Sequence, residues 1–191
     1  MGFINKCLYN SRLRRLQECL QKFKNEKGMD YQTAILKKMK NGYPVYLVLC
    51  TSSEDGQVYV GCIHVVTTKG SDRGLTYLVV TDECKYIKIG DIRHETLNQG
   101  IGTQMLIILD EIANEYSIYK ITAWLSPKDL ETHRERLLHF YEKNGYELTQ
   151  GKDTDMNIEG LIATKYLREC NQHLKHTKTA AKAAVLASIS S

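Results

Sequence analysis

Two glycines lie in the segment of the chain that is best suited to bind an anion. Residues 98–104 read Asn-Gln-Gly-Ile-Gly-Thr-Gln, between a strand-like run at 86–93 and a helix-like run that begins at Met105. A helix that starts after such a turn offers N–H groups without an intrahelical partner, and these can bind a phosphate. Gly100 and Gly102 have no Cβ, so a phosphate can approach the main chain closely. Because the segment has no basic side chain, the backbone must carry most of this recognition.

The spacing of apolar residues predicts the helices and strands that position this turn. Apolar residues at helical spacing predict helices at 11–27, 30–41, 105–115 and 130–143. Runs rich in β-branched and aromatic residues predict strands at 45–49, 58–66, 75–80, 86–93, 118–125, 146–148 and 161–166. Two helices therefore precede an antiparallel meander. The dipeptide Asn144-Gly145 marks the end of the last helix.

Size and composition indicate one globular domain. The chain has 191 residues, of which 42% are hydrophobic and 25% charged, as in ordinary soluble domains. It lacks a run of about 20 apolar residues, which a membrane-spanning helix needs. The first residues also lack the apolar core of a signal peptide. We therefore expect a cytoplasmic location and no membrane association.

The six cysteines do not have the spacing of metal ligands. They stand at positions 7, 19, 50, 62, 84 and 170, and no two of them form a Cys-x-x-Cys pair. The sequence therefore predicts no metal site. Disulfides are not expected in a reducing cytoplasm, so buried free thiols are the prediction.

Positive charge is concentrated at the N-terminal end of the chain. Residues 1–42 contain ten Lys and Arg against three acidic residues, whereas residues 43–167 contain twelve against eighteen. A solvated helix face explains such a pattern. The alternative is that the basic N-terminal helices bind an acidic or phosphate-bearing partner.

The element order and two motifs resemble the GNAT superfamily of acetyl-CoA-dependent N-acetyltransferases over residues 1–168. The family turn, Arg/Gln-x-x-Gly-x-Gly/Ala, is similar to Gly100-Ile101-Gly102, with Leu97 at the position of the usual Arg or Gln. A second family segment, Phe-Tyr-x-x-x-Gly-Phe, resembles residues 140–146, which contain Tyr141. The resemblance implies an α/β (α+β) fold with a mixed, mostly antiparallel twisted sheet flanked by helices. Residues 169–191, basic and Ala-rich, are expected to form a flexible tail.

The resemblance implies acetyl-CoA as the cosubstrate and no metal. The backbone near Ile92 would meet the pantetheine and the thioester. The amides of the turn would hold the pyrophosphate, and they belong to Asn98, Gln99, Gly100, Ile101, Gly102 and Thr103. Arg134 stands where family members often have an Asn, and its guanidinium can reach a CoA phosphate.

The resemblance also suggests the groups that move protons. Tyr141 is expected to protonate the leaving thiolate, and the ordinary tyrosine pKa of about 10 suits that role. Glu95 is the expected general base for the amine. Asp91 and His94 flank the same strand end, and Asp91 is an alternative base. All three side chains can equally be solvated turn residues.

The leading hypothesis is an N-acetyltransferase that acts on a primary amine of a protein, a small molecule or an aminoacyl-tRNA. The basic N-terminal helices lie where the superfamily shapes its acceptor groove, so an acidic or phosphate-bearing acceptor is one expectation. A homodimer, common in the superfamily, is left open. The alternative is a non-catalytic CoA-binding or protein-interaction module, which the departures at Leu97 and Arg134 favour.

Overall fold

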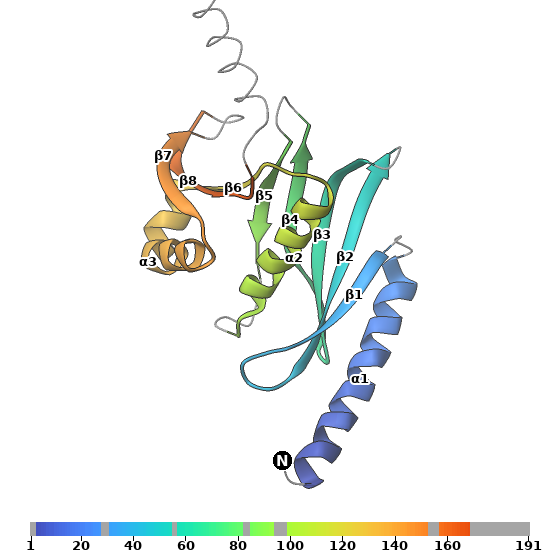
Figure 1. Ribbon diagram of the computed structural model, residues 1–191. Coiled ribbons are helices and arrows are strands. Elements are labelled where there is room, and N and C mark those ends of the chain that lie inside the picture. The colour runs from blue at the N-terminus through green and yellow to red at the C-terminus, as the bar shows by residue number, and fades with distance from the viewer. Residues whose placement is uncertain are drawn as a thin grey trace, which may run out of the picture. The chain divides into compact units, whose positions relative to one another are not determined.

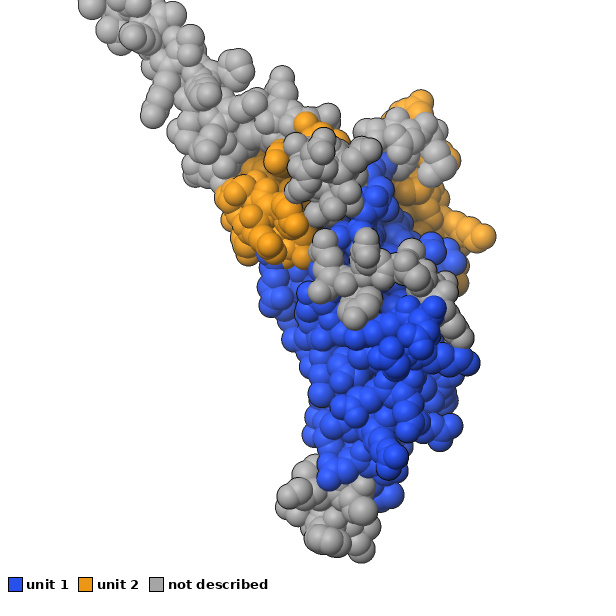
Figure 2. Space-filling view, turned by 90° about the vertical axis from the view of Figure 1, so that its right-hand side faces the viewer, with its two compact units in different colours: residues 1–79, 88–111 blue, residues 80–87, 112–191 orange. Residues whose placement is uncertain are grey.

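The computed structural model describes residues 3–27, 31–54, 57–81, 85–93, 99–152 and 157–168. Figure 1 shows the helices and strands in these ranges. The chain divides into two compact units, one of residues 1–79 with 88–111 and the other of residues 80–87 with 112–191 (Figure 2). The described residues confirm the predicted class, since they form mostly antiparallel strands together with helices.

The first unit is built on an antiparallel meander. Its helices and strands are α1 (Phe3–Lys27), β1 (Tyr31–Lys38), β2 (Pro44–Glu54), β3 (Gln57–Thr67) and most of β4 (Gly70–Val80), β5 (Tyr86–Ile92) and α2 (Ile101–Glu115). The strands follow the order β1-β2-β3-β4-β5, and each of the first three pairs is antiparallel (Figure 1). This order confirms the predicted meander.

Residues 61–66 of strand β3 are buried or half-buried, because their side chains alternate between two helices. On one face, Val66 belongs to a core cluster with Leu16 and Phe23 of α1. On the other face, Val65 meets α2, since a Cβ built at Gly74 would lie 2.6 Å from Val65 Cγ2 and 2.7 Å from Met105 Sδ. The lack of a side chain at Gly74 therefore lets helix α2 pack closely on the sheet.

The predicted second helix at 30–41 is wrong, because residues 31–38 form strand β1. This strand pairs antiparallel with β2, and Ala34 lies opposite Val48. The apolar spacing fitted a helix, but a short apolar run cannot distinguish a helix from a strand. Ladder hydrogen bonds and the packing of Ala34 against the α1 core cluster favour the strand. One helix, not two, thus precedes the described strands.

The second unit contains β6 (Lys120–Leu125), α3 (Pro127–Lys143), β7 (Glu147–Lys152) and β8 (Glu159–Tyr166). The strand order is β6-β8-β7, and both pairs are antiparallel. Ala123 of β6 lies opposite Ala163 of β8, and both are buried. Helix α3 contacts β7 and β8. The predicted tail, residues 169–191, lies outside the described residues, so the domain boundary at 168 stays a prediction.

Within the described ranges, no helix has the length and hydrophobicity that crossing a membrane requires.

Candidate functional site

Gly100 forms the turn at which helix α2 begins. Its φ is +80°, a conformation that glycine adopts without strain. Its carbonyl accepts a hydrogen bond from the N–H of Gln104 at 3.1 Å, which is the first bond of the helix. The N–H groups of the three residues between them have no intrahelical acceptor in an α-helix, and these residues are Ile101, Gly102 and Thr103. The predicted turn covers residues 98–104, and its residues from Ile101 onward belong to the first turn of α2.

Buried side chains hold this helix start in place. Ile101 is 4% exposed and Met105 is fully buried. Helix α2, described along its whole length, has no acidic residue in its first turn. The positive end of the helix dipole therefore has no carboxylate of that turn beside it, which suits an external anion.

The hairpin turn between β1 and β2 contacts this helix start. The backbone N–H of Lys40 donates to the carbonyl of Gln99 at 3.2 Å, and the N–H of Asn41 donates to Gln99 Oε1 at 3.1 Å. A Cβ built at Gly100 would lie 3.8 Å from both Cγ and Cε of Lys40. The aliphatic chain of Lys40 therefore passes beside the glycine turn and brings a cation to the start of α2.

Lys40 is a residue that sequence analysis missed. It belongs to a basic stretch with Lys37 and Lys38, which the sequence does not connect with residues 98–104. The role predicted for the Gln99 amide N–H, to hold the pyrophosphate, stays a prediction, because the bonds from the β1–β2 turn are accepted by its side chain and carbonyl. No local pattern links these two segments, because only their tertiary packing brings them together.

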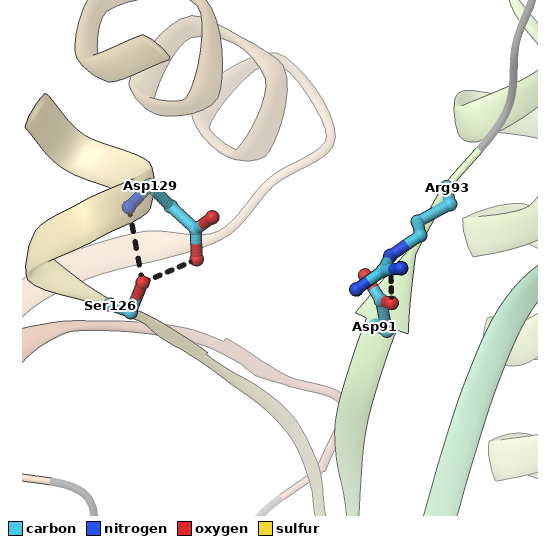
Figure 3. Close-up of polar contacts among 4 residues, drawn as sticks. All are labelled: Asp91, Arg93, Ser126 and Asp129. Carbon is cyan, nitrogen blue, oxygen red and sulfur yellow. Dashed lines mark hydrogen bonds and ion pairs between the residues drawn. The ribbon is translucent and has the colours of Figure 1, made fainter. Parts of the chain in front are cut away.

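Strand β5 ends at Ile92, whose backbone is expected to meet the thioester. Ile92 is half-buried at the last position of the strand, and the N–H of Arg93 donates to the carbonyl of Gly74 at 2.7 Å. Asp91, the alternative base, forms an ion pair with Arg93 (Figure 3). Their side chains are 44% and 82% exposed, so this pair contributes little to stability. The predicted residues Glu95 and Asn98 lie outside the described residues, as do His94 and Leu97.

Tyr141 lies in the last turn of α3, in the second unit. Its side chain is 5% exposed, and its ring makes edge-on contacts with Phe140 at 5.2 Å and Tyr146 at 5.3 Å. The helix ends as predicted: Asn144 is the C-cap, and Gly145 has φ +82°. The N–H of Tyr146 donates to the carbonyl of Tyr141 at 3.1 Å. Residues 140–146 thus fold back on themselves. The contacts with Phe140 and Tyr146 fix the orientation of the Tyr141 ring.

Arg134 lies near the middle of α3, whose first turn is fixed by a cap. Ser126 caps the helix, since its Oγ accepts from the N–H of Asp129 at 3.1 Å and donates to Asp129 Oδ2 at 2.6 Å (Figure 3). The backbone of His133 is not helical, with φ −140° and ψ 24°. Arg134 follows this kink and is exposed, so its guanidinium is available to solvent.

These residues offer two kinds of chemistry, one in each unit. In the first unit, the turn from Gln99 to Thr103, together with Lys40, has the donors and the charge that bind a phosphate. In the second unit, the Tyr141 hydroxyl is a group that can donate a proton. The described residues also bring Cys50, Cys62 and His64 together, which the sequence spacing did not predict.

Comparison with known proteins gives one sequence relative and several structures of similar fold. No family model matches the chain. The uncharacterized protein YocC of Bacillus subtilis strain 168 is 31% identical over 107 residues, which cover 56% of this chain. The chain spans 64% of the length of that relative.

Solved acetyltransferases resemble the chain in fold. A GNAT family acetyltransferase from Elizabethkingia anophelis, with acetyl-CoA bound, covers 65% of this chain and 76% of its own at 17% identity and a TM-score of 0.38. An aminoglycoside 6'-N-acetyltransferase complexed with coenzyme A covers 64% and 73%, at 14% identity and a TM-score of 0.39. The IAA acetyltransferase from Bacillus cereus ATCC 14579 covers 65% and 77%, at 14% identity and a TM-score of 0.38.

Proposed function

We propose that the protein is an N-acetyltransferase that moves the acetyl group of acetyl-CoA to a primary amine. The observation that carries this proposal is the start of helix α2, where Gly100 has φ +80° and the chain of Lys40 passes beside it. CoA contains a pyrophosphate, and the family turn to which residues 97–102 are similar binds that group through main-chain N–H groups. The sequence motif at residues 97–102 and the geometry at the start of α2 thus both support CoA as the ligand.

The proposed cofactor contacts divide between main chain and side chains. The N–H groups of Ile101, Gly102 and Thr103 would donate to the pyrophosphate oxygens, and the Lys40 ammonium would balance their charge. The backbone near Ile92, at the end of β5, would meet the pantetheine. Arg134, exposed beyond the α3 kink, is proposed to bind a further CoA phosphate.

The reaction needs two proton movements. The amine nitrogen attacks the thioester carbonyl carbon, the C–S bond breaks and an amide forms. We assign Tyr141 as the donor of a proton to the departing thiolate, because a phenol has a pKa close to that of a thiol. The amine gives up its proton to a base, for which Glu95 is proposed. Asp91 is the weaker choice, because its carboxylate is already paired with the Arg93 guanidinium.

The acceptor is proposed to be acidic or phosphate-bearing. Helix α1 exposes Arg12, Arg14 and Arg15. Arg12 lies over the ring of Tyr43, 3.9 Å from its centroid, and donates to the Tyr43 hydroxyl at 3.2 Å. The other two arginines leave a basic surface on α1, although Arg14 also pairs with Glu18. Binding of such an acceptor should weaken steeply as the salt concentration rises.

The proposal can be tested by titrating acetyl-CoA into the chain in a calorimeter. The variant Gly102→Glu introduces a carboxylate into the first turn of α2, where it favours the helix but repels a pyrophosphate. We expect acetyl-CoA affinity to fall about 10–100-fold, or about 1.4–2.7 kcal/mol, while the melting temperature is retained. The control is Gly102→Ala, which adds a methyl group without charge. Equal affinity in all three chains would refute the cofactor site.

A second candidate is a module that binds CoA without catalysis. The burial of Tyr141 against Phe140 and Tyr146 favours it, because a packing role alone explains that contact. The variant Tyr141→Phe keeps the ring and removes the hydroxyl. An enzyme should lose turnover about 100-fold or more while keeping its acetyl-CoA affinity. If CoA release from acetyl-CoA is the same in both chains across a panel of amines, the binding module is the correct reading.

A further inference from the structure

Two cysteines and a histidine meet on one face of the first unit. Cys50 of β2 lies directly opposite Cys62 of β3, and His64 follows two residues later on the same strand. Side chains two residues apart in a strand point to the same face. The two Sγ atoms and an imidazole nitrogen lie within 4.8 Å of one another. Antiparallel pairing thus brings the Cys50 sulfur of β2 to the ligand atoms of Cys62 and His64 on β3.

Helix α1 covers this cluster. The ring of Phe23 lies 5.0 Å from the His64 ring, and Cys50 belongs to the same core cluster as Leu16 and Phe23. Both Cys50 and His64 are 5% exposed. Burial, and then the neighbouring Cys62 thiol, raise the pKa of Cys50 to about 11. Without a metal ion, the Cys50 thiol therefore remains protonated at neutral pH.

We propose that Cys50, Cys62 and His64 bind a structural Zn²⁺ ion. Thiolate and imidazole are the ligands that zinc prefers in proteins. Two thiolates neutralise the double charge of the ion, so the complex carries no net charge into the core. This matters because an uncompensated charge is costly in an apolar interior. The site is separate from the acetyl-CoA proposal and does not depend on it.

The spacing of the ligand atoms is close to that of a zinc site. In a tetrahedral site with Zn–S bonds of about 2.3 Å, two sulfur atoms lie about 3.8 Å apart. The observed spread of up to 4.8 Å therefore requires a contraction of about 1 Å, which side-chain torsions can provide.

Coordination is balanced by the release of protons. Each thiol loses its proton to solvent as its Zn–S bond forms, and the neutral imidazole binds through a ring nitrogen. Two protons thus leave for each ion bound through these three residues. The ion would link β2 to β3 beneath α1. It would therefore stabilise the folded chain over the unfolded one.

Metal analysis of the full chain tests the proposal. The chain is purified under reducing conditions, loaded with Zn²⁺ and dialysed against metal-free buffer. We expect one zinc ion per chain in the native protein, and affinity at least about 100-fold weaker in Cys62→Ser and His64→Gln. The control Val48→Ala removes a buried side chain from the same core cluster and keeps all three ligands. The Val48→Ala variant should retain the zinc. The control therefore distinguishes the loss of a zinc ligand from the loss of core packing.

A second measurement uses the native chain alone, in case the variants fail to fold. Cobalt(II) replaces zinc in such sites, and thiolate ligands give it a charge-transfer absorption. We expect this band at one equivalent of cobalt and its loss when Zn²⁺ is added. We also expect the melting temperature to rise by about 5–10 °C when free Zn²⁺ exceeds its Kd about 100-fold. The proposal is overturned if the native chain retains no zinc and shows no such band, or if both ligand variants bind zinc as tightly as the native chain.

Discussion

The N-termini of helices α2 and α3 are built in opposite ways. Helix α3 is capped by its own side chains: Ser126 Oγ accepts from the N–H of Asp129, and the Asp129 carboxylate lies in the first turn (Figure 3). Helix α2 follows Gly100, which has no side chain to act as a cap, and its first turn has no acidic residue. A lysine lies beside it instead.

This difference shows why only one of the two helices is a candidate anion site. Every helix has a positive N-terminal end and N–H groups without intrahelical acceptors. At α3, a hydroxyl and a carboxylate of the chain itself already occupy that end. At α2, the first turn contains no carboxylate, and we propose that its N–H groups bind a ligand that brings negative charge. The chemistry that surrounds a helix start, and not the helix dipole alone, therefore selects the binding site.

The largest change in stability is expected when a methyl group is added at the α2 turn. Because Gly100 has φ +80°, Gly100→Ala should destabilise the chain by about 1–2 kcal/mol. The same change two residues later, Gly102→Ala, lies inside the helix and should stabilise it by up to about 1 kcal/mol. Thermal unfolding should thus lower the melting temperature of the first variant and raise that of the second. Equal shifts would mean that the turn does not require glycine.

A smaller effect is expected when the cap of α3 is removed. Ser126→Ala leaves the Asp129 N–H without its acceptor and should cost about 1 kcal/mol, as measured by urea unfolding. Ser126→Asn provides another capping oxygen and should recover most of this loss. Neither variant should change acetyl-CoA affinity measured by calorimetry. A large fall in affinity with Ser126→Ala would show that the α3 end also serves a ligand.

The smallest effect is expected from the lysine beside the α2 turn. Lys40→Ala should weaken acetyl-CoA binding about 3–5-fold, because an exposed charge near a phosphate contributes about 0.5–1 kcal/mol. The control is Lys38→Ala, since the Lys38 chain passes beside Gly42 of the hairpin turn. Titrations at low and high salt should show a weaker salt dependence for Lys40→Ala only. The same loss in both variants would indicate a general effect of net charge.

Most of the fold could be predicted from the sequence, because local patterns decide most of its elements. The strand at 118–125 was expected from its apolar run, and the structure forms β6 at Lys120–Leu125. The end of α3 at Asn144 and Gly145 was also predicted correctly. Strand β1 was predicted as a helix, because the apolar spacing of residues 31–38 suits either structure. Pairing with β2, a contact between distant segments, decided between them.

The candidate site was predicted only in part. The strand–turn–helix order around Gly100 was visible because a turn glycine and a helix start are local features. The roles of Tyr141 and Arg134 came from a motif and stay predictions. Lys40 could not be predicted, since nothing in its neighbourhood connects it with residues 98–104.

The sequence by itself determined the features that depend on neighbouring residues: the α2 turn, the cap and end of α3, and most strands of the meander. Tertiary structure decided what distant residues do together. It brought Lys40 to Gly100 through the β1–β2 turn, and it placed Cys50 opposite Cys62 and beside His64. The physical reason is that turns and caps are set by local backbone preferences and hydrogen bonds. Pairing between strands depends instead on register and packing across the sheet, which local sequence does not specify.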